Sequence, residues 1–193
     1  MKNLFVPFLL LFAVVFVGCD DDVPEAEDAP ELITKVQLLF SPKSGGSPIV
    51  VEAIDDDGIG PNDLEPSSAI VLAAGEEYEL FLDLENTLNN ESITEEVEEE
   101  SDEHMFFFAF TEGLFSSPAG SGNMTDRSAQ VNYIDEDANG LPIGLITSWV
   151  AAEAGSTGSF RVVLKHQPDI KSETSTANDG ETDVDITWSI TVE

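Results

Sequence analysis

The sequence contains two histidines, and each lies at the end of a predicted strand. His104 follows Glu103 and begins the apolar run MFFFAF, whereas His166 ends the run RVVLKH just before Gln167-Pro168-Asp169. If the two strands are neighbours, both imidazoles meet Glu103 or Asp169, a donor set that suits a transition metal. Two imidazoles could also hold a haem iron from opposite sides. We predict a metal or haem site at Glu103, His104 and His166; the alternative is two packed or solvated side chains without a ligand.

A second pattern of possible ligands is the segment 135–144, DEDANGLPIG. Asp135, Asp137 and Asn139 supply oxygen atoms at alternate positions, and Gly140 permits a sharp turn, as in the first half of a calcium loop. The carboxylate that closes an EF-hand would fall on Ile146, which excludes that motif. The segment predicts either a calcium site at Asp135, Asp137 and Asn139 or a turn whose side chains bind their own backbone.

A third feature is the segment 95–103, EEVEEESDE, which places seven acids in nine residues before the most apolar strand. As a helix it would align Ile93, Val97 and Ser101 on one side; as a coil it would form an acidic flap. Like charges at this density repel one another unless cations bridge them. We consider two functions, a solvated loop and a surface that binds cations or a basic partner.

No pattern in the sequence indicates catalysis. There is no G-x-S-x-G nucleophile turn, no glycine-rich phosphate loop before a helix and no H-E-x-x-H pair. Carboxylates are so numerous that the choice of any two as acid and base would be arbitrary. We therefore expect that the protein is not an enzyme.

Short strands at regular intervals are expected to position these residues. Alternating or continuous apolar runs, separated by clusters of Gly, Pro, Asn and Asp, predict about nine strands. They are 33–40, 49–54, 69–73, 77–84, 105–110, 129–134, 145–151, 159–166 and 183–192. The run 105–110 is wholly apolar, which predicts a central strand buried on both sides.

Short strands without long helical crossovers favour antiparallel pairing in one all-β domain. We predict an antiparallel β-sandwich over residues 32–193, with a small closed β-barrel as the alternative. A transmembrane barrel is not expected, because nearly every strand would need an apolar outer face and aromatic girdles.

The first residues have the organisation of an export signal. Lys2 supplies a positive start, the apolar run 4–17 is shorter than the roughly 20 residues of a spanning helix, and Gly18-Cys19 precedes Asp20. We predict a signal peptide at 1–18, cleaved before Cys19, and an acidic tether at 19–31. Cys19 is the single cysteine, so an intramolecular disulfide and a multi-thiolate zinc site are excluded.

The charge of the chain limits its partners. Asp and Glu number 39 against 7 Lys and Arg, for a formal net charge of −32. Nucleic acid is excluded as a partner, because phosphate binding requires a basic surface. Cations, basic proteins and water are the favoured partners.

The segment Phe16-Val17-Gly18-Cys19 resembles a bacterial lipobox, although Phe16 stands where Leu is commoner. The resemblance implies acylation of Cys19 and membrane attachment through that lipid; the alternative is an ordinary secretory signal with an incidental cysteine. Acids directly after the cysteine resemble the surface-export signal of Bacteroidota-type lipoproteins, which implies the outer membrane and the cell surface. Because Asp at this position favours inner-membrane retention in other Gram-negative bacteria, the periplasmic face remains the alternative.

The order ITKVQLLFSP, ITEEVEEESDEHMFF, VNYIDEDANGLPIGL, VVLKHQPD and NDGETDVDITWSITV is similar to a family of small Bacteroidota-type lipoproteins often encoded near TonB-dependent receptors. The resemblance covers most of the mature chain. It implies an accessory role in uptake of a metal or of haem, as in surface haem-capture lipoproteins, with a TonB-dependent receptor as partner. The alternative is a structural, acidic surface lipoprotein that binds no small ligand.

Overall fold

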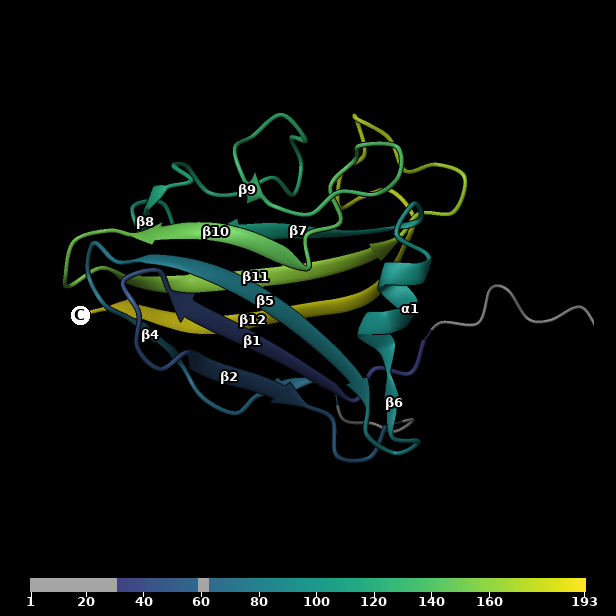
Figure 1. Ribbon diagram of the computed structural model, residues 1–193, viewed down its shortest axis with the longest axis horizontal. Helices are drawn as coiled ribbons and strands as arrows, with labels where there is room; N and C mark the ends of the chain where they lie inside the picture. Colours follow the sequence, from purple (N-terminus) through teal and green to yellow (C-terminus); the bar gives the residue numbers. More distant parts are fainter. Residues whose placement is uncertain (1–30, 59–62) are drawn as a thin grey trace, which may run out of the picture.

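The protein is an all-β sandwich of two packed sheets (Figure 1), as the sequence predicts. This computed structural model describes residues 31–58 and 63–193. The expected signal peptide, which ends at Gly18, and all but the last residue of the expected tether, which begins at Cys19, lie outside the described residues. Among the described residues the two sheets do not join into a closed barrel, although one of them is curled into a half-barrel.

The larger sheet has eight strands in the described part of the chain, in the order β3-β2-β1-β5-β10-β8. In addition, β6 pairs with β5 and β9 pairs with β10. All of these pairs are antiparallel. The bounds are β1 Lys35–Pro42, β2 Ile49–Ile54, β3 Glu65–Pro66, β5 Glu77–Asn86, β6 Glu91–Ser92, β8 Phe115–Ser117, β9 Asn132–Tyr133 and β10 Ile146–Ala151.

The smaller sheet has the order β4-β12-β11-β7 among the described residues. Its strands are β4 Ile70–Leu72, β7 His104–Phe110, β11 Thr157–His166 and β12 Glu181–Val192. The pair β4–β12 is parallel, which departs from the expected antiparallel pairing. The reason is that β4 is a short crossover between β3 and β5 of the larger sheet, so no hairpin sets its direction.

One expectation about β7 is wrong, because β7 lies at an edge of its sheet and not in the centre. The strand is nevertheless buried, since a loop covers the free edge. Phe106 N donates to Ile143 O at 2.7 Å, and Phe108 N donates to the Asn123 side chain at 3.1 Å. Gly122 permits this approach, because a Cβ there would lie 2.0 Å from the Phe108 carbonyl oxygen.

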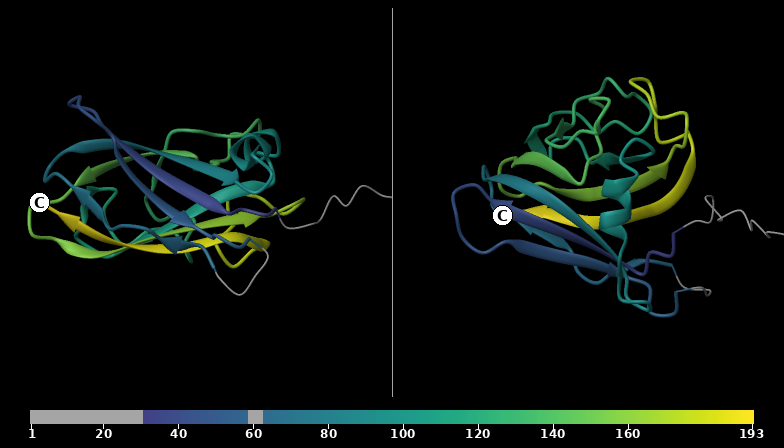
Figure 2. Two further views of the ribbon diagram at one scale, coloured as in Figure 1. Left: turned by 90° about the horizontal axis from the view of Figure 1, so that it is seen from below. Right: turned by 45° about the vertical axis from the view of Figure 1, so that its right-hand side comes forward.

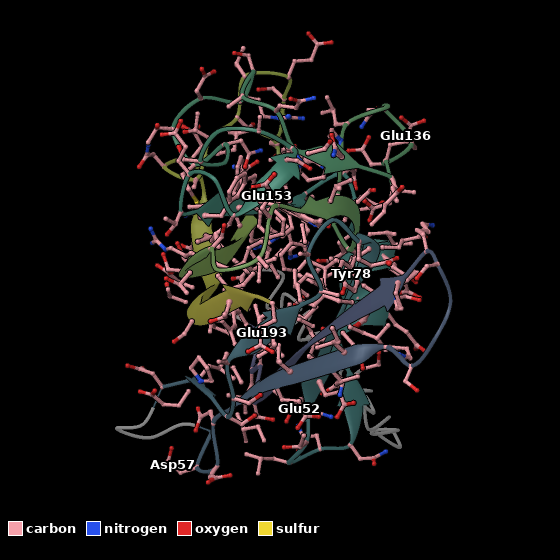
Figure 3. All side chains as sticks on the ribbon, turned by 90° about the vertical axis from the view of Figure 1, so that its left-hand side faces the viewer. Glu52, Asp57, Tyr78, Glu136, Glu153 and Glu193 are labelled. Carbon is pink, nitrogen blue, oxygen red and sulfur yellow. The ribbon has the colours of Figure 1, made fainter. Side chains whose placement is uncertain are left out.

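Aromatic side chains fill the space between the sheets. Trp149 of β10 packs 5.5 Å from Phe108 and 5.1 Å from Phe160, measured between ring centroids. Trp188 of β12 is also fully buried. Figure 3 shows Tyr78 among these interior side chains and Glu136 on an outer loop. Apolar burial of this extent is the main stabilising contribution to the fold.

One short helix, α1 Ile93–Glu99, lies at one end of the sandwich, and the C-terminus lies at the other (Figures 1 and 2). Ser92 caps its N-terminus by accepting a hydrogen bond from Glu95 N at 3.3 Å. Ile93 and Val97, one turn apart, are buried in the core. The helical alternative therefore holds as far as Glu99, whereas residues 100–103 form a turn and Ser101 does not join the helical stripe.

Candidate metal centre

The two histidines lie side by side because β7 and β11 are antiparallel neighbours. His104 and His166 are register partners, so their side chains project from the same face of the sheet. The imidazole rings are stacked, with centroids 4.6 Å apart and planes 10° apart. Figure 1 shows the end of β11 close to α1, at the end of the molecule opposite the C-terminus.

His104 is a neutral, buried imidazole whose orientation is set by the backbone. Its exposed fraction is 1%, and its Nδ1 lies 3.2 Å from the carbonyl oxygen of Glu100. Since a carbonyl can only accept, Nδ1 carries the proton and Nε2 presents a lone pair. Burial, and then the proximity of His166, lower the pKa of His104 to about 4.

His166 is less enclosed than His104. Its side chain is 18% exposed, and its Nε2 donates to Glu103 Oε2 at 3.2 Å. It also lines a cavity of about 300 Å³ with Pro168, Ile170, Gly180 and Glu181. Solutes can therefore reach the stacked pair from the side of His166.

Glu100 supplies the third candidate ligand. Ligand atoms of Glu100, His104 and His166 all lie within 4.8 Å of one another, the one such group among residues 31–58 and 63–193. Glu100 is the C-cap of α1, which has no basic residue in its last turn. A carboxylate at a helix C-terminus is unfavourable, because that end of the helix dipole is negative. A cation bound by Glu100 would remove this repulsion.

Two further carboxyl groups, those of Glu31 and Asp183, interact with this group and have raised pKa values. Burial first, then Glu96, Asp183 and Glu100, raise the pKa of Glu31 to about 7. Burial also raises the pKa of Asp183 to about 6, although His166 and Lys165 oppose that shift. Burial, together with neighbouring acids, therefore disfavours the charged forms of these two carboxyl groups.

The structure brings His104 and His166 together, as a shared metal site requires. The acids that accompany them differ from the expected Glu103 and Asp169. Glu103 is a hydrogen-bond acceptor of His166 and does not belong to the convergent group. Asp169 is exposed, with a left-handed φ of 61°. Glu100 was missed, although its spacing of four residues from His104 is a helical signal. Glu31 and Asp183 carry no local signal, because only the fold brings them near.

The predicted calcium segment has partners for its carboxylates within the protein. Asp137 Oδ1 accepts from the backbone of Asn139 and Leu141, at 2.8 and 2.9 Å. Its Oδ2 lies 2.9 Å from Lys171 Nζ, with both side chains almost fully buried. Both oxygens of Asp135 accept backbone N–H groups. The turn therefore resembles the metal-free alternative, in which side chains bind their own backbone.

Lys171 also positions the histidine site. Its Nζ donates to the Ser101 carbonyl at 2.6 Å while it pairs with Asp137. It thereby connects the loop after β11 with the turn that carries Glu100 and Glu103. Burial raises the pKa of Asp137, but hydrogen bonds from Lys171 and the backbone outweigh that effect and lower it overall.

No protein-family model, curated protein or solved structure matches this chain. In the part of the chain that the structure describes, no helix is both long and apolar enough to cross a bilayer.

Proposed function

We propose that this chain is an exported lipoprotein, anchored through acylated Cys19 to the outer membrane, whose sandwich domain binds one divalent transition-metal ion. The observation that carries the proposal is the convergence of Glu100, His104 and His166 within 4.8 Å. Two imidazoles and a carboxylate suit Zn²⁺ and its neighbours, whereas Ca²⁺ and Mg²⁺ take oxygen ligands.

The charge of the site supports the same function. Burial and neighbouring acids disfavour the charged forms of Glu31 and Asp183, which raises the pKa of Glu31 to about 7 and that of Asp183 to about 6. A divalent cation would reverse that preference, since nearby positive charge favours the carboxylate. The hydrogen bond from His104 Nδ1 to a backbone carbonyl is the usual support of a metal-binding histidine.

The stacked rings favour an ion over haem. Each nitrogen lone pair lies in its ring plane, and one ion cannot lie in two separate planes that are nearly parallel. Binding therefore requires one ring to turn, and His166 is the more exposed of the two. A porphyrin between the rings would require a much larger separation of two paired strands.

Metal analysis of the purified, detergent-solubilised protein tests this function. We expect about one Zn²⁺ per chain after equilibrium dialysis, and His166→Ala should weaken binding at least about tenfold. Asp169→Asn, an exposed change three residues away, should leave affinity unchanged. A wild-type protein that retains no Zn²⁺ would contradict the proposal and leave the structural, ligand-free lipoprotein as the better account.

The anchor is tested separately. Cys19→Ser should abolish acylation in mass spectra and move the protein from the membrane fraction to the soluble fraction. Protease added to intact cells should digest the wild-type domain if it lies on the cell surface. The proposed partner is a TonB-dependent receptor, so co-purification with wild type and not with Cys19→Ser is expected. An unmodified Cys19 in membrane-bound protein would contradict the anchor.

A further inference from the structure

We propose that Glu31 is the fourth ligand of the metal centre and closes it. This inference rests on the proposed metal-binding function. Glu31 Oε1 lies 3.9 Å from Nε2 of His104, and the Glu31 side chain is 17% exposed. Nε2 is the nitrogen whose lone pair is free, and it makes no hydrogen bond to any described residue.

The contact between Glu31 and His104 is not explained as an ion pair. Nδ1 of His104 donates its proton to the Glu100 carbonyl oxygen at 3.2 Å, so Nε2 presents a lone pair to Glu31. The distance of 3.9 Å also exceeds the range of about 2.7–3.2 Å for an N–H···O hydrogen bond. A half-buried carboxyl group therefore faces the lone pair of a buried imidazole, with no hydrogen bond between the two groups.

An ion between the two groups would satisfy both. Ligand atoms about 2.0–2.2 Å from a tetrahedral Zn²⁺ lie about 3.4 Å apart. The observed separation of 3.9 Å needs an approach of only about half an ångström. Glu31 lies outside the group of ligand atoms within 4.8 Å of one another, so its side chain must also move toward Glu100 or His166. Such a movement does not disturb a strand, because Glu31 precedes β1.

The four ligands would come from four separate segments. Glu31 lies before β1, Glu100 ends α1, His104 begins β7 and His166 ends β11. Two imidazoles and two carboxylates complete a tetrahedral shell and leave no position for water or substrate. The centre would hold and carry an ion, in contrast to catalytic zinc sites, which keep one position open.

The test compares Glu31→Gln with Glu96→Gln in the full, detergent-solubilised protein. Glu96 belongs to the same acidic group and hydrogen-bonds to Glu31, so its change alters the acidic surroundings of Glu31 without removing a proposed ligand. We expect Glu31→Gln to weaken Zn²⁺ binding at least tenfold, and Glu96→Gln less than threefold. With Co²⁺ as the probe, Glu31→Gln should also reduce the visible absorption of the four-coordinate ion, whereas Glu96→Gln should preserve it.

The outcomes separate this inference from the function on which it rests. If wild type binds Zn²⁺ and Glu31→Gln keeps its affinity and Co²⁺ spectrum, the role of Glu31 is overturned while the proposed function stands. Equal weakening by both variants, with unchanged spectra, would also overturn it, because only the charge would matter. If wild type binds no metal, the proposed function itself fails.

Discussion

At the scale of single residues, the centre combines a histidine that is difficult to protonate with a carboxyl group that is difficult to deprotonate. His104 stays neutral at pH values where an exposed histidine begins to bind a proton. Glu31 keeps its proton at pH values where an exposed carboxyl group has lost it. Both effects have burial as their largest cause, so the metal-free centre is costly to ionise.

The stability of the metal-free protein should therefore depend on Glu31 in a defined pH range. The pKa of this group is about 4.5 ordinarily and about 7 in the fold. A raised carboxyl pKa contributes stability below pH 4.5, and that contribution is lost as the pH rises through about 7. His104 acts in the opposite sense, since its lowered pKa costs stability as the pH falls from about 6.5 through about 4.

Glu31→Gln imitates the protonated group and isolates its effect. At pH 8.5, with a chelator present, we expect this variant to be about 1–3 kcal/mol more stable than wild type. At pH 4 the difference should vanish. Urea unfolding at both pH values measures this, with the exposed Glu99→Gln as the control. Equal stability of variant and wild type at pH 8.5 would show that Glu31 is not perturbed.

At the scale of elements, the loop that contains Ser121 and Asn123 covers the free edge of β7, so this edge strand is buried. Phe106, Phe108 and Phe110 each donate a backbone N–H to this loop or to the segment before β10. The Tyr133 hydroxyl group adds a hydrogen bond to the Phe106 carbonyl at 2.7 Å. This support matters for function, because β7 begins with His104.

Gly122 is the residue on which this close approach depends. We expect Gly122→Ala to destabilise the protein by at least about 2 kcal/mol, since its φ is 99° and the added Cβ would meet the Phe108 carbonyl. Thermal unfolding measures the loss. Gly140→Ala is the matched control, because Gly140 has a φ of 79° but open space around its Cβ position. A similar loss in both variants would assign the effect to backbone strain alone.

The strands were largely predictable from the sequence, whereas their places within the two sheets were less predictable. Each of the nine expected strands has a counterpart, although the one expected at 129–134 is reduced to Asn132–Tyr133; most show a period of two in the sequence because their burial alternates. The three additional strands among residues 31–58 and 63–193, β3, β6 and β8, are too short to show a period. The edge position of β7 was not predictable, because an apolar run covered by a loop has the same sequence as one between two strands.

The site was predictable in part, because some of its features are local in the sequence and others depend on the fold. His104 and His166 stand out by residue type, and their strand ends are local features. Their pairing depends on register, which a single sequence does not specify. Glu31 is far from both histidines in the sequence. Nothing in the sequence distinguishes it from the other acids of the tether, because only the fold brings it close to His104.

At the scale of the whole molecule, the excess of negative charge is a property that ions in solution can moderate. With 39 acids and 7 Lys and Arg, the formal charge is −32. Self-repulsion in a compact state lowers stability, and salt screens it within a Debye length of about 10 Å at 0.1 M. Several charge pairs also occur, such as Arg161 with Asp185, but that pair is exposed and contributes little.

We therefore expect the melting temperature to rise with NaCl. Between 20 and 500 mM the rise should be about 2–4 °C, which corresponds to about 1 kcal/mol in a domain of this size. Calorimetry with a chelator present measures the effect without bound metal. A melting temperature that falls with salt would show that the attractive pairs outweigh the repulsion.

The two tryptophans have a practical consequence for all of these measurements. Trp149 belongs to the larger sheet and Trp188 to the smaller one, and both are fully shielded from water. Their fluorescence should shift to longer wavelength when water reaches them, so each layer carries one intrinsic optical reporter. A single emission transition would then indicate that both layers separate and unfold together.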